Sequence, residues 1–195
     1  ILSVVVHGQV DGKPLPVLEL LSYYFLLVVA GNETTRNAMT GGVQQLIDNP
    51  GELAKMIATP ELVDGMVEET VRWVTPVNQF ARTATRDVRV RDQLVKTGQS
   101  VCLFYCSGNR DEEIFEDPFA FRIDRNPNNH IGFGRGEHVC LGAHLARLEL
   151  RLLFDELRQR LISIERSGPV DRMLSSFIGG IKRAPIRWEL RAGRV

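Results

Sequence analysis

Cysteine is scarce in this sequence, and it has neither long apolar runs nor an excess of one charge. The 195 residues include three cysteines with no CxxC or HxxxH spacing, so the ligand clusters of zinc and iron–sulfur sites are not indicated. The longest apolar run, Leu20 to Ala30, is interrupted by Ser22 and is too short to cross a bilayer. Acidic and basic residues balance at 24 each, which gives no basic excess for nucleic acid. These absences predict a cytoplasmic protein with no membrane span and no nucleic-acid partner.

The most informative stretch runs from Gly132 to Gly142. Glycines at 132, 134 and 136 would each destabilise a helix by about 1 kcal/mol, but they suit a backbone that turns tightly or lies against another body. Cys140 follows, and an amphipathic run from Leu141 to about Leu161 predicts a long helix whose N-terminus would favour a thiolate. The residues alone leave open a nucleophile with His138 as base, a zinc or iron–sulfur ligand, or a haem ligand. The cysteine count disfavours the zinc and iron–sulfur alternatives.

The segment Phe133-Gly134-Arg135-Gly136-Glu137-His138-Val139-Cys140-Leu141-Gly142 resembles the FxxGxxxCxG haem-binding loop of the cytochromes P450. The resemblance implies that Cys140 is the axial thiolate ligand of the iron of haem b. It also implies that the loop lies against the porphyrin and that His138 contacts a propionate. The loop residues implied to bind the cofactor are Phe133, Gly134, Gly136, His138, Cys140 and Gly142.

A second motif interrupts a long helical segment predicted from about Pro16 to Ile47. Its first half is so apolar that we expect it to be buried nearly all round. Ala30-Gly31-Asn32-Glu33-Thr34-Thr35 then breaks the pattern, either as a helix end with a new N-cap or as a local distortion that exposes an acid and a hydroxyl.

This stretch resembles the AGx(D/E)TT motif of the distal helix in the same family. The resemblance places Ala30 and Gly31 beside the haem. It implies that Glu33 and Thr34 are catalytic, as the acid–alcohol pair that delivers protons for cleavage of the O–O bond.

The resemblance changes the interpretation of two arginines, Arg72 and Arg82. Glu69 and Arg72 have ExxR spacing on a helix predicted from Thr59-Pro60 to about Val74, and alone they would be read as a solvated surface pair. The resemblance implies a buried clamp that supports the proximal haem side. Arg82 is either a solvent-facing residue of an edge strand or, by resemblance, the partner of a haem propionate.

The remaining cysteines and the last helix are assigned to packing. Cys102 and Cys106 lie in a strand-like run from residue 100 to 106 and are predicted to be small buried residues. In the helix after Cys140 we expect the leucines inside and the arginines outside, where they form a solvated face or a docking surface for an acidic electron donor. The leucines are Leu145, Leu148, Leu152 and Leu153, and the arginines are Arg147, Arg151, Arg158 and Arg160.

The resemblance covers essentially the whole chain and implies a mainly α fold with small β-sheets. Residues 1–195 would be the C-terminal portion of a single cytochrome P450 domain, from the long distal helix through the haem–thiolate loop. The chain begins without Met and without a recognisable signal peptide, which suggests a start within a longer protein. The amino-acid sequence of residues 26–38 resembles that of actinobacterial family members that hydroxylate terminal methyl carbons of branched lipids and sterol side chains.

The activity implied is haem–thiolate monooxygenation, which inserts one oxygen atom of O2 into a C–H bond of a lipophilic substrate. Electrons would come from NAD(P)H through a ferredoxin-type donor on the proximal face. Two alternatives remain: a peroxide-using haem–thiolate enzyme, against which Glu33 and Thr34 argue, and a non-catalytic haem-binding or partner-interacting fragment.

Overall fold

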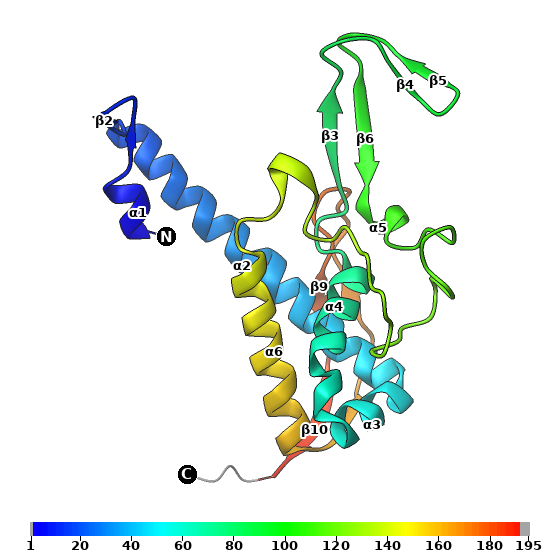
Figure 1. Cartoon of the computed structure of the whole chain (residues 1–195). Helices are drawn as coiled ribbons and strands as arrows, with labels where there is room; N and C mark the ends of the chain where they lie inside the picture. Colours follow the sequence, from blue (N-terminus) through cyan, green and yellow to red (C-terminus); the bar gives the residue numbers. More distant parts are fainter. Residues whose placement is uncertain (1, 192–195) are drawn as a thin grey trace.

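The chain folds into a helical core with several small two-stranded sheets, as the computed structural model of residues 2–191 shows (Figure 1). Three helices pack against one another: α2 (Val17–Asp48), α4 (Val63–Val74) and α6 (Ala143–Arg160). Their buried side chains form one apolar cluster that includes Leu46 and Phe154. The mainly α architecture with small sheets is therefore confirmed.

Shorter elements surround this core. The other helical segments are α1 (Leu2–Val6), α3 (Pro50–Ala58), η1 (Pro60–Leu62), α5 (Tyr105–Gly108) and η2 (Gly136–His138). None of the helices in the part of the chain that the structure describes is both long and apolar enough to cross a membrane.

Every strand pair is antiparallel. β3 (Gln79–Thr83) pairs with β6 (Ser100–Phe104), and this ribbon projects from the helices with the β4–β5 hairpin at its end (Figure 1). β7 (Leu161–Arg166) follows α6 directly and pairs with β10 (Ile186–Leu190). The remaining strands are β1 (Gln9–Val10), β2 (Lys13–Pro14), β4 (Val88–Val90), β5 (Gln93–Val95), β8 (Asp171–Arg172) and β9 (Ile181–Arg183).

Helix α2 continues without a break through the Ala30–Thr35 stretch. A helix end at Gly31 with a new N-cap is therefore wrong, whereas a local distortion within the continuous helix stays a prediction. One glycine costs only about 1 kcal/mol in a helix, which the surrounding helix can absorb. The Thr34 hydroxyl also finds a partner within the helix, because Thr34 Oγ1 donates to the Ala30 carbonyl at 2.7 Å.

The first half of α2 is exposed, so the prediction of a helix buried nearly all round is wrong. Phe25 keeps 71% of its surface and Val28 keeps 67%, whereas Leu46 near the other end keeps 1%. The buried residues of α2 all lie between Thr35 and Leu46, so only the half of the helix after Glu33 packs against α4 and α6. The apolar first half faces solvent in residues 2–191.

The buried face of α6 also differs from the prediction. Leu145, Leu148 and Leu152 are exposed, and Leu153 is half-buried. The core side of the helix instead carries Ala143, Leu150, Phe154 and Leu157. A helix with apolar residues on two faces gives no sequence signal for which face meets the core.

The two other cysteines are not the buried strand residues that were predicted. Cys102 lies on β6, where it is exposed and its thiol donates to Gln79 Oε1 at 2.9 Å. Strand β6 ends at Phe104, so Cys106 belongs to α5 and is half-buried. An edge ribbon has two solvated sides, which is why strand alternation did not bury Cys102.

Replacing Gly65 with alanine should destabilise the chain by about 1–3 kcal/mol or more. Gly65 lies on α4, and a β-carbon there would meet the carbonyl oxygen of Ile123 at 2.0 Å, so backbone would have to move. Gly51→Ala in α3 is the matched control, since nothing lies within 4 Å of its added methyl. Chemical denaturation should show a loss for Gly65→Ala and none for Gly51→Ala. Equal free energies of unfolding would contradict the close approach.

Candidate haem-binding site

The loop from Phe133 to Gly142 is closed by its own backbone. The Cys140 N–H donates to the Phe133 carbonyl at 2.8 Å, and the Gly134 N–H donates to the Ile131 carbonyl at 2.8 Å. Gly134 and Gly136 both have φ +72°, a left-handed conformation that L side chains rarely adopt. The glycines are therefore needed for the fold of the loop itself.

Cys140 ends this loop with an exposed, free thiol, two residues before the N-cap of α6. Its chain neighbours Val139 and Leu141 are apolar and exposed, Leu141 at 72%. A β-carbon at Gly142 would make only an ordinary van der Waals contact with Cys140 Sγ, at 3.9 Å. One accessible thiol among exposed apolar residues fits a flat apolar macrocycle whose metal needs one protein ligand.

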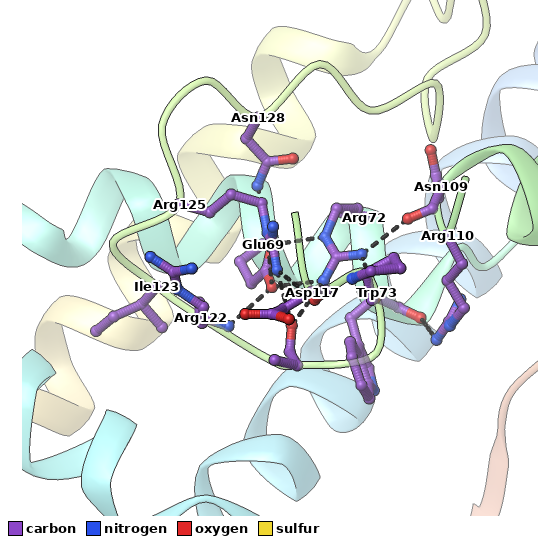
Figure 2. Close-up of polar contacts among 12 residues, drawn as sticks. Glu69, Arg72, Trp73, Asn109, Arg110, Asp117, Arg122, Ile123, Arg125 and Asn128 are labelled. Atoms are coloured by element: carbon purple, nitrogen blue, oxygen red, sulfur yellow. Dashed lines mark hydrogen bonds and ion pairs between the residues drawn. The ribbon is translucent and has the colours of Figure 1, made fainter. Parts of the chain in front are cut away.

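Helix α4 carries a buried ion pair, Glu69 with Arg72 (Figure 2). Arg72 donates from Nη2 to Glu69 Oε1 and from Nε to Glu69 Oε2, both at 2.7 Å, and both side chains are 0% exposed. Arg72 also donates to the carbonyls of Asn109 (2.8 Å), Pro118 (2.9 Å) and Ala120 (3.0 Å). The spacing alone favoured a solvated surface pair, but the side chains form the buried bidentate pair that the resemblance implied, and Arg72 also binds carbonyls of the segment from 109 to 120.

Sequence reasoning missed three further partners of Glu69. Arg125 Nε lies 3.3 Å from Glu69 Oε2, and Asn128 Nδ2 donates to the same oxygen at 3.0 Å. The Arg122 N–H donates to Glu69 Oε1 at 2.8 Å. These groups come from an irregular segment more than 50 positions further along, so no local spacing could have pointed to them. These donors supply the remaining hydrogen bonds that the buried Glu69 carboxylate needs.

A second carboxylate on α4, Glu68, faces the cysteine loop and α6. Arg147 Nε donates to Glu68 Oε1 at 2.6 Å, and His130 Nε2 lies 2.9 Å from Glu68 Oε2. Partial burial raises the pKa of Glu68, but the hydrogen bonds from His130 and Arg147 outweigh it and hold the pKa at about 2. None of these three residues was predicted to lie at the site, and Arg147 was assigned to the outer face of the helix.

The depressed pKa of Glu68 predicts a pH-dependent contribution to stability. Because the folded-state pKa lies below the ordinary value of 4.5, the contribution is present above about pH 4.5 and is lost as the pH falls towards 2. Thermal unfolding of wild type and Glu68→Gln should therefore differ most near neutral pH and converge in acid. A difference between their Tm values that stays constant from pH 7 to about pH 2.5 would contradict this linkage.

The acid–alcohol pair lies on α2. Glu33 Oε1 accepts hydrogen bonds from Arg36 Nη2 at 2.5 Å and from Asn37 Nδ2 at 3.4 Å. The Glu33 side chain is 34% exposed. The side chains of Glu33 and Thr34 thus both have hydrogen-bond partners within α2, and the Glu33 carboxylate is accessible to water.

The other predicted cofactor contacts lie on three different elements. Ala30 and Gly31 are exposed on α2, and a β-carbon at Gly31 would meet nothing within 4 Å. Arg82 is half-buried on β3 with its Nη1 donating to the Ala81 carbonyl at 3.0 Å, and His138 is exposed in η2. All four are accessible to a ligand, and no contact ties them to Cys140.

The arginines of α6 are paired with acids. Arg151 pairs with Asp64, Arg158 with Asp155 at 2.6 Å, and Arg160 with Glu156 at 3.7 Å. Together with the Arg147–Glu68 pair, this leaves the helix with less uncompensated positive charge than the sequence suggested. A docking surface for an acidic partner would have to use other cations of this side, such as the exposed Arg135.

A mainly helical fold with a free thiol just before a long helix, and a buried glutamate–arginine pair on a neighbouring helix, agrees with the arrangement that the sequence resemblance implies. Comparison with known proteins specifies the family. The family model for cytochrome P450 matches residues 5–162. The chain belongs to the cytochrome P450 family.

Individual relatives agree. The chain is 47% identical over 188 residues to a methyl-branched lipid omega-hydroxylase of Mycobacterium tuberculosis, covering 95% of this chain and 44% of the relative. It is 40% identical over 185 residues to a steroid C26-monooxygenase of the same species, covering 93% and 42%. A crystal structure of a cytochrome P450 from Novosphingobium aromaticivorans superimposes with TM-score 0.92 and 39% identity, covering 97% and 46%. The chain therefore spans less than half the length of these relatives.

Proposed function

We propose that this chain carries the thiolate ligand and the proton-delivery residues of a haem monooxygenase that hydroxylates a lipophilic substrate. The observation that carries the proposal is the exposed Cys140 thiol at the end of a loop closed by its own backbone. Residues 1–195 would form the C-terminal portion of one cytochrome P450 domain. The cytoplasmic location predicted from the sequence stays a prediction.

In this proposal Cys140 binds the iron of haem b through its sulfur, and the cofactor supplies the oxygen-activating chemistry. Phe133, Gly134, Gly136 and Gly142 shape the loop that lies against the porphyrin. Arg82 and His138 would donate hydrogen bonds to its propionates, and the open space beside Gly31 would leave room for the cofactor next to α2. The Glu69–Arg72 clamp keeps the segment that precedes the loop in place.

Proton delivery would use the hydroxyl of Thr34 and the carboxylate of Glu33. The Thr34 proton points to the Ala30 carbonyl, which leaves the oxygen lone pairs free to accept a further hydrogen bond. Glu33 is partly exposed and can therefore exchange protons with water. Electrons would reach the site from NAD(P)H through a ferredoxin-type donor on the cysteine-loop side.

The substrate we propose is a branched lipid or a sterol side chain, hydroxylated at a terminal methyl carbon with one atom of O2. Support comes from the lipid and steroid hydroxylases among the relatives. Apolar surface is also available: Phe80 on β3 packs edge-to-face on Phe177 with centroids 5.4 Å apart, and Leu174, three positions before Phe177 in the chain, is fully exposed. These side chains suit an apolar ligand better than a charged one.

Haem titration of the 195-residue chain tests the proposal. We expect saturable uptake and, after reduction under carbon monoxide, the red-shifted Soret band of a thiolate-ligated haem. A bound haem without that band would contradict the assignment of Cys140.

The second candidate is a non-catalytic haem-binding or partner-interacting fragment. It is favoured by the exposed apolar faces of α2 and α6 and by the coverage of less than half of each relative. If the chain took up haem only after a second polypeptide covering the rest of the relatives' length was added, that result would favour this alternative.

A further inference from the structure

Glu68 lies where three parts of the chain meet. It belongs to α4, and its carboxylate receives Arg147 of α6 and His130 of the segment that leads into the cysteine loop. The Arg147 contact is bidentate, since Nη2 also donates to Glu68 Oε2 at 3.0 Å. The His130 side chain is only 4% exposed. This geometry is more restrained than that of an ordinary surface ion pair.

His130 connects the carboxylate to the loop backbone. The Gly132 N–H donates to His130 Nδ1 at 3.1 Å, so this nitrogen carries no proton. The ring proton is therefore on Nε2, from which it is donated to Glu68. One imidazole thus fixes the start of the loop relative to α4.

Arg147 restrains the same loop from the other side. Its guanidinium carbon lies 4.5 Å from the centroid of the Phe133 ring, and the rings of Phe133 and His130 are 5.9 Å apart. The Phe133 carbonyl in turn accepts the Cys140 N–H at 2.8 Å. A continuous series of contacts therefore leads from Glu68 to the residue that bears the thiol.

We propose that Glu68 is a positioning residue for Cys140: it holds His130 and Arg147, which together fix Phe133, whose carbonyl holds the Cys140 amide. This inference rests on the function proposed above, because a fixed thiol matters only if it binds a ligand. Glu68 also compensates the positive charge of Arg147, because both oxygens of its carboxylate accept hydrogen bonds from that guanidinium. Without Glu68, that positive charge would favour the more negative, reduced form of a thiolate-ligated haem.

The test compares Glu68→Gln with Asp64→Asn. Asp64 pairs with Arg151, also between α4 and α6, but on an exposed surface with no link to the loop. In the haem-free chain we expect amide hydrogen exchange at Gly132 and Cys140 to be roughly tenfold faster in Glu68→Gln and unchanged in Asp64→Asn, which is the rate change for about 1.4 kcal/mol in local opening. In the haem-loaded chain we expect the reduction potential of Glu68→Gln alone to become more positive.

The outcomes separate this inference from the proposed function. Equal exchange in both variants would overturn the positioning role, whether or not the chain binds haem. An unchanged potential in Glu68→Gln would overturn the charge compensation. Faster exchange in Glu68→Gln together with a wild type that shows no thiolate band would support the positioning of Cys140 and contradict the haem assignment instead.

Discussion

Replacing Arg72 with methionine should lower the free energy of unfolding by about 3–5 kcal/mol. The substitution leaves the Glu69 carboxylate, which is 0% exposed, with a single cationic neighbour, Arg125, at 3.3 Å. It also removes the donor from the buried carbonyls of Asn109 and Pro118. Removing one partner of a buried ion pair costs much more than the intact pair contributes, so the loss should exceed that of any surface pair. Equilibrium denaturation of the 195-residue chain measures it.

The matched control is Arg187→Met. Arg187 also forms an ion pair, with Glu165 at 2.8 Å, but its side chain is 76% exposed. We expect this variant to lose less than about 1 kcal/mol. If Arg72→Met lost no more than Arg187→Met, the clamp would have no structural role.

Replacing Cys140 with serine should abolish the thiolate-type Soret band of the reduced carbon monoxide complex, together with any monooxygenase activity. The hydroxyl is a hard, weakly acidic donor that does not replace a thiolate on haem iron. Because Cys140 is exposed, the unfolding free energy of the haem-free chain should change by no more than about 0.5 kcal/mol. The spectrum and the stability measurement together separate loss of the ligand from loss of the fold.

The chain supplies its own controls, since Cys102 and Cys106 are also free thiols. Cys102→Ser and Cys106→Ser should keep the wild-type spectrum. A thiolate band that survives Cys140→Ser and disappears in Cys106→Ser would show that the ligand had been assigned to the wrong cysteine.

Local sequence was sufficient where a feature depends on neighbouring residues. The glycines before Cys140 indicated a tightly turning backbone, and two of them adopt φ +72°. The spacing of Glu69 and Arg72 placed both on one helix face, where they form a bidentate pair. Helix α6 begins at Ala143, close to its predicted start at Leu141. The functional roles of these residues stay predictions.

Long-range partners and burial could not be predicted in the same way. Nothing near Arg125 or Asn128 indicates that they reach Glu69, because the contact depends on how an irregular segment folds back over α4. Hydrophobicity also does not specify what covers a surface. Leu145, Leu148 and the first half of α2 are apolar enough for a core, yet they face solvent in residues 2–191.

Helix α2 is therefore one element with two local stabilities. The half after Glu33 is held by α4 and α6, whereas the half before it is contacted mainly by the short α1 (Figure 1). An unsupported helix of about 15 residues is only marginally stable in water, so this half should sample helix–coil transitions while the other half does not. Ala30, Gly31 and Glu33 lie at the boundary between the two halves. Whether these residues stay helical therefore depends on what covers the first half of α2. A ligand that contacts them must also offset the free-energy cost of keeping this part of the helix folded.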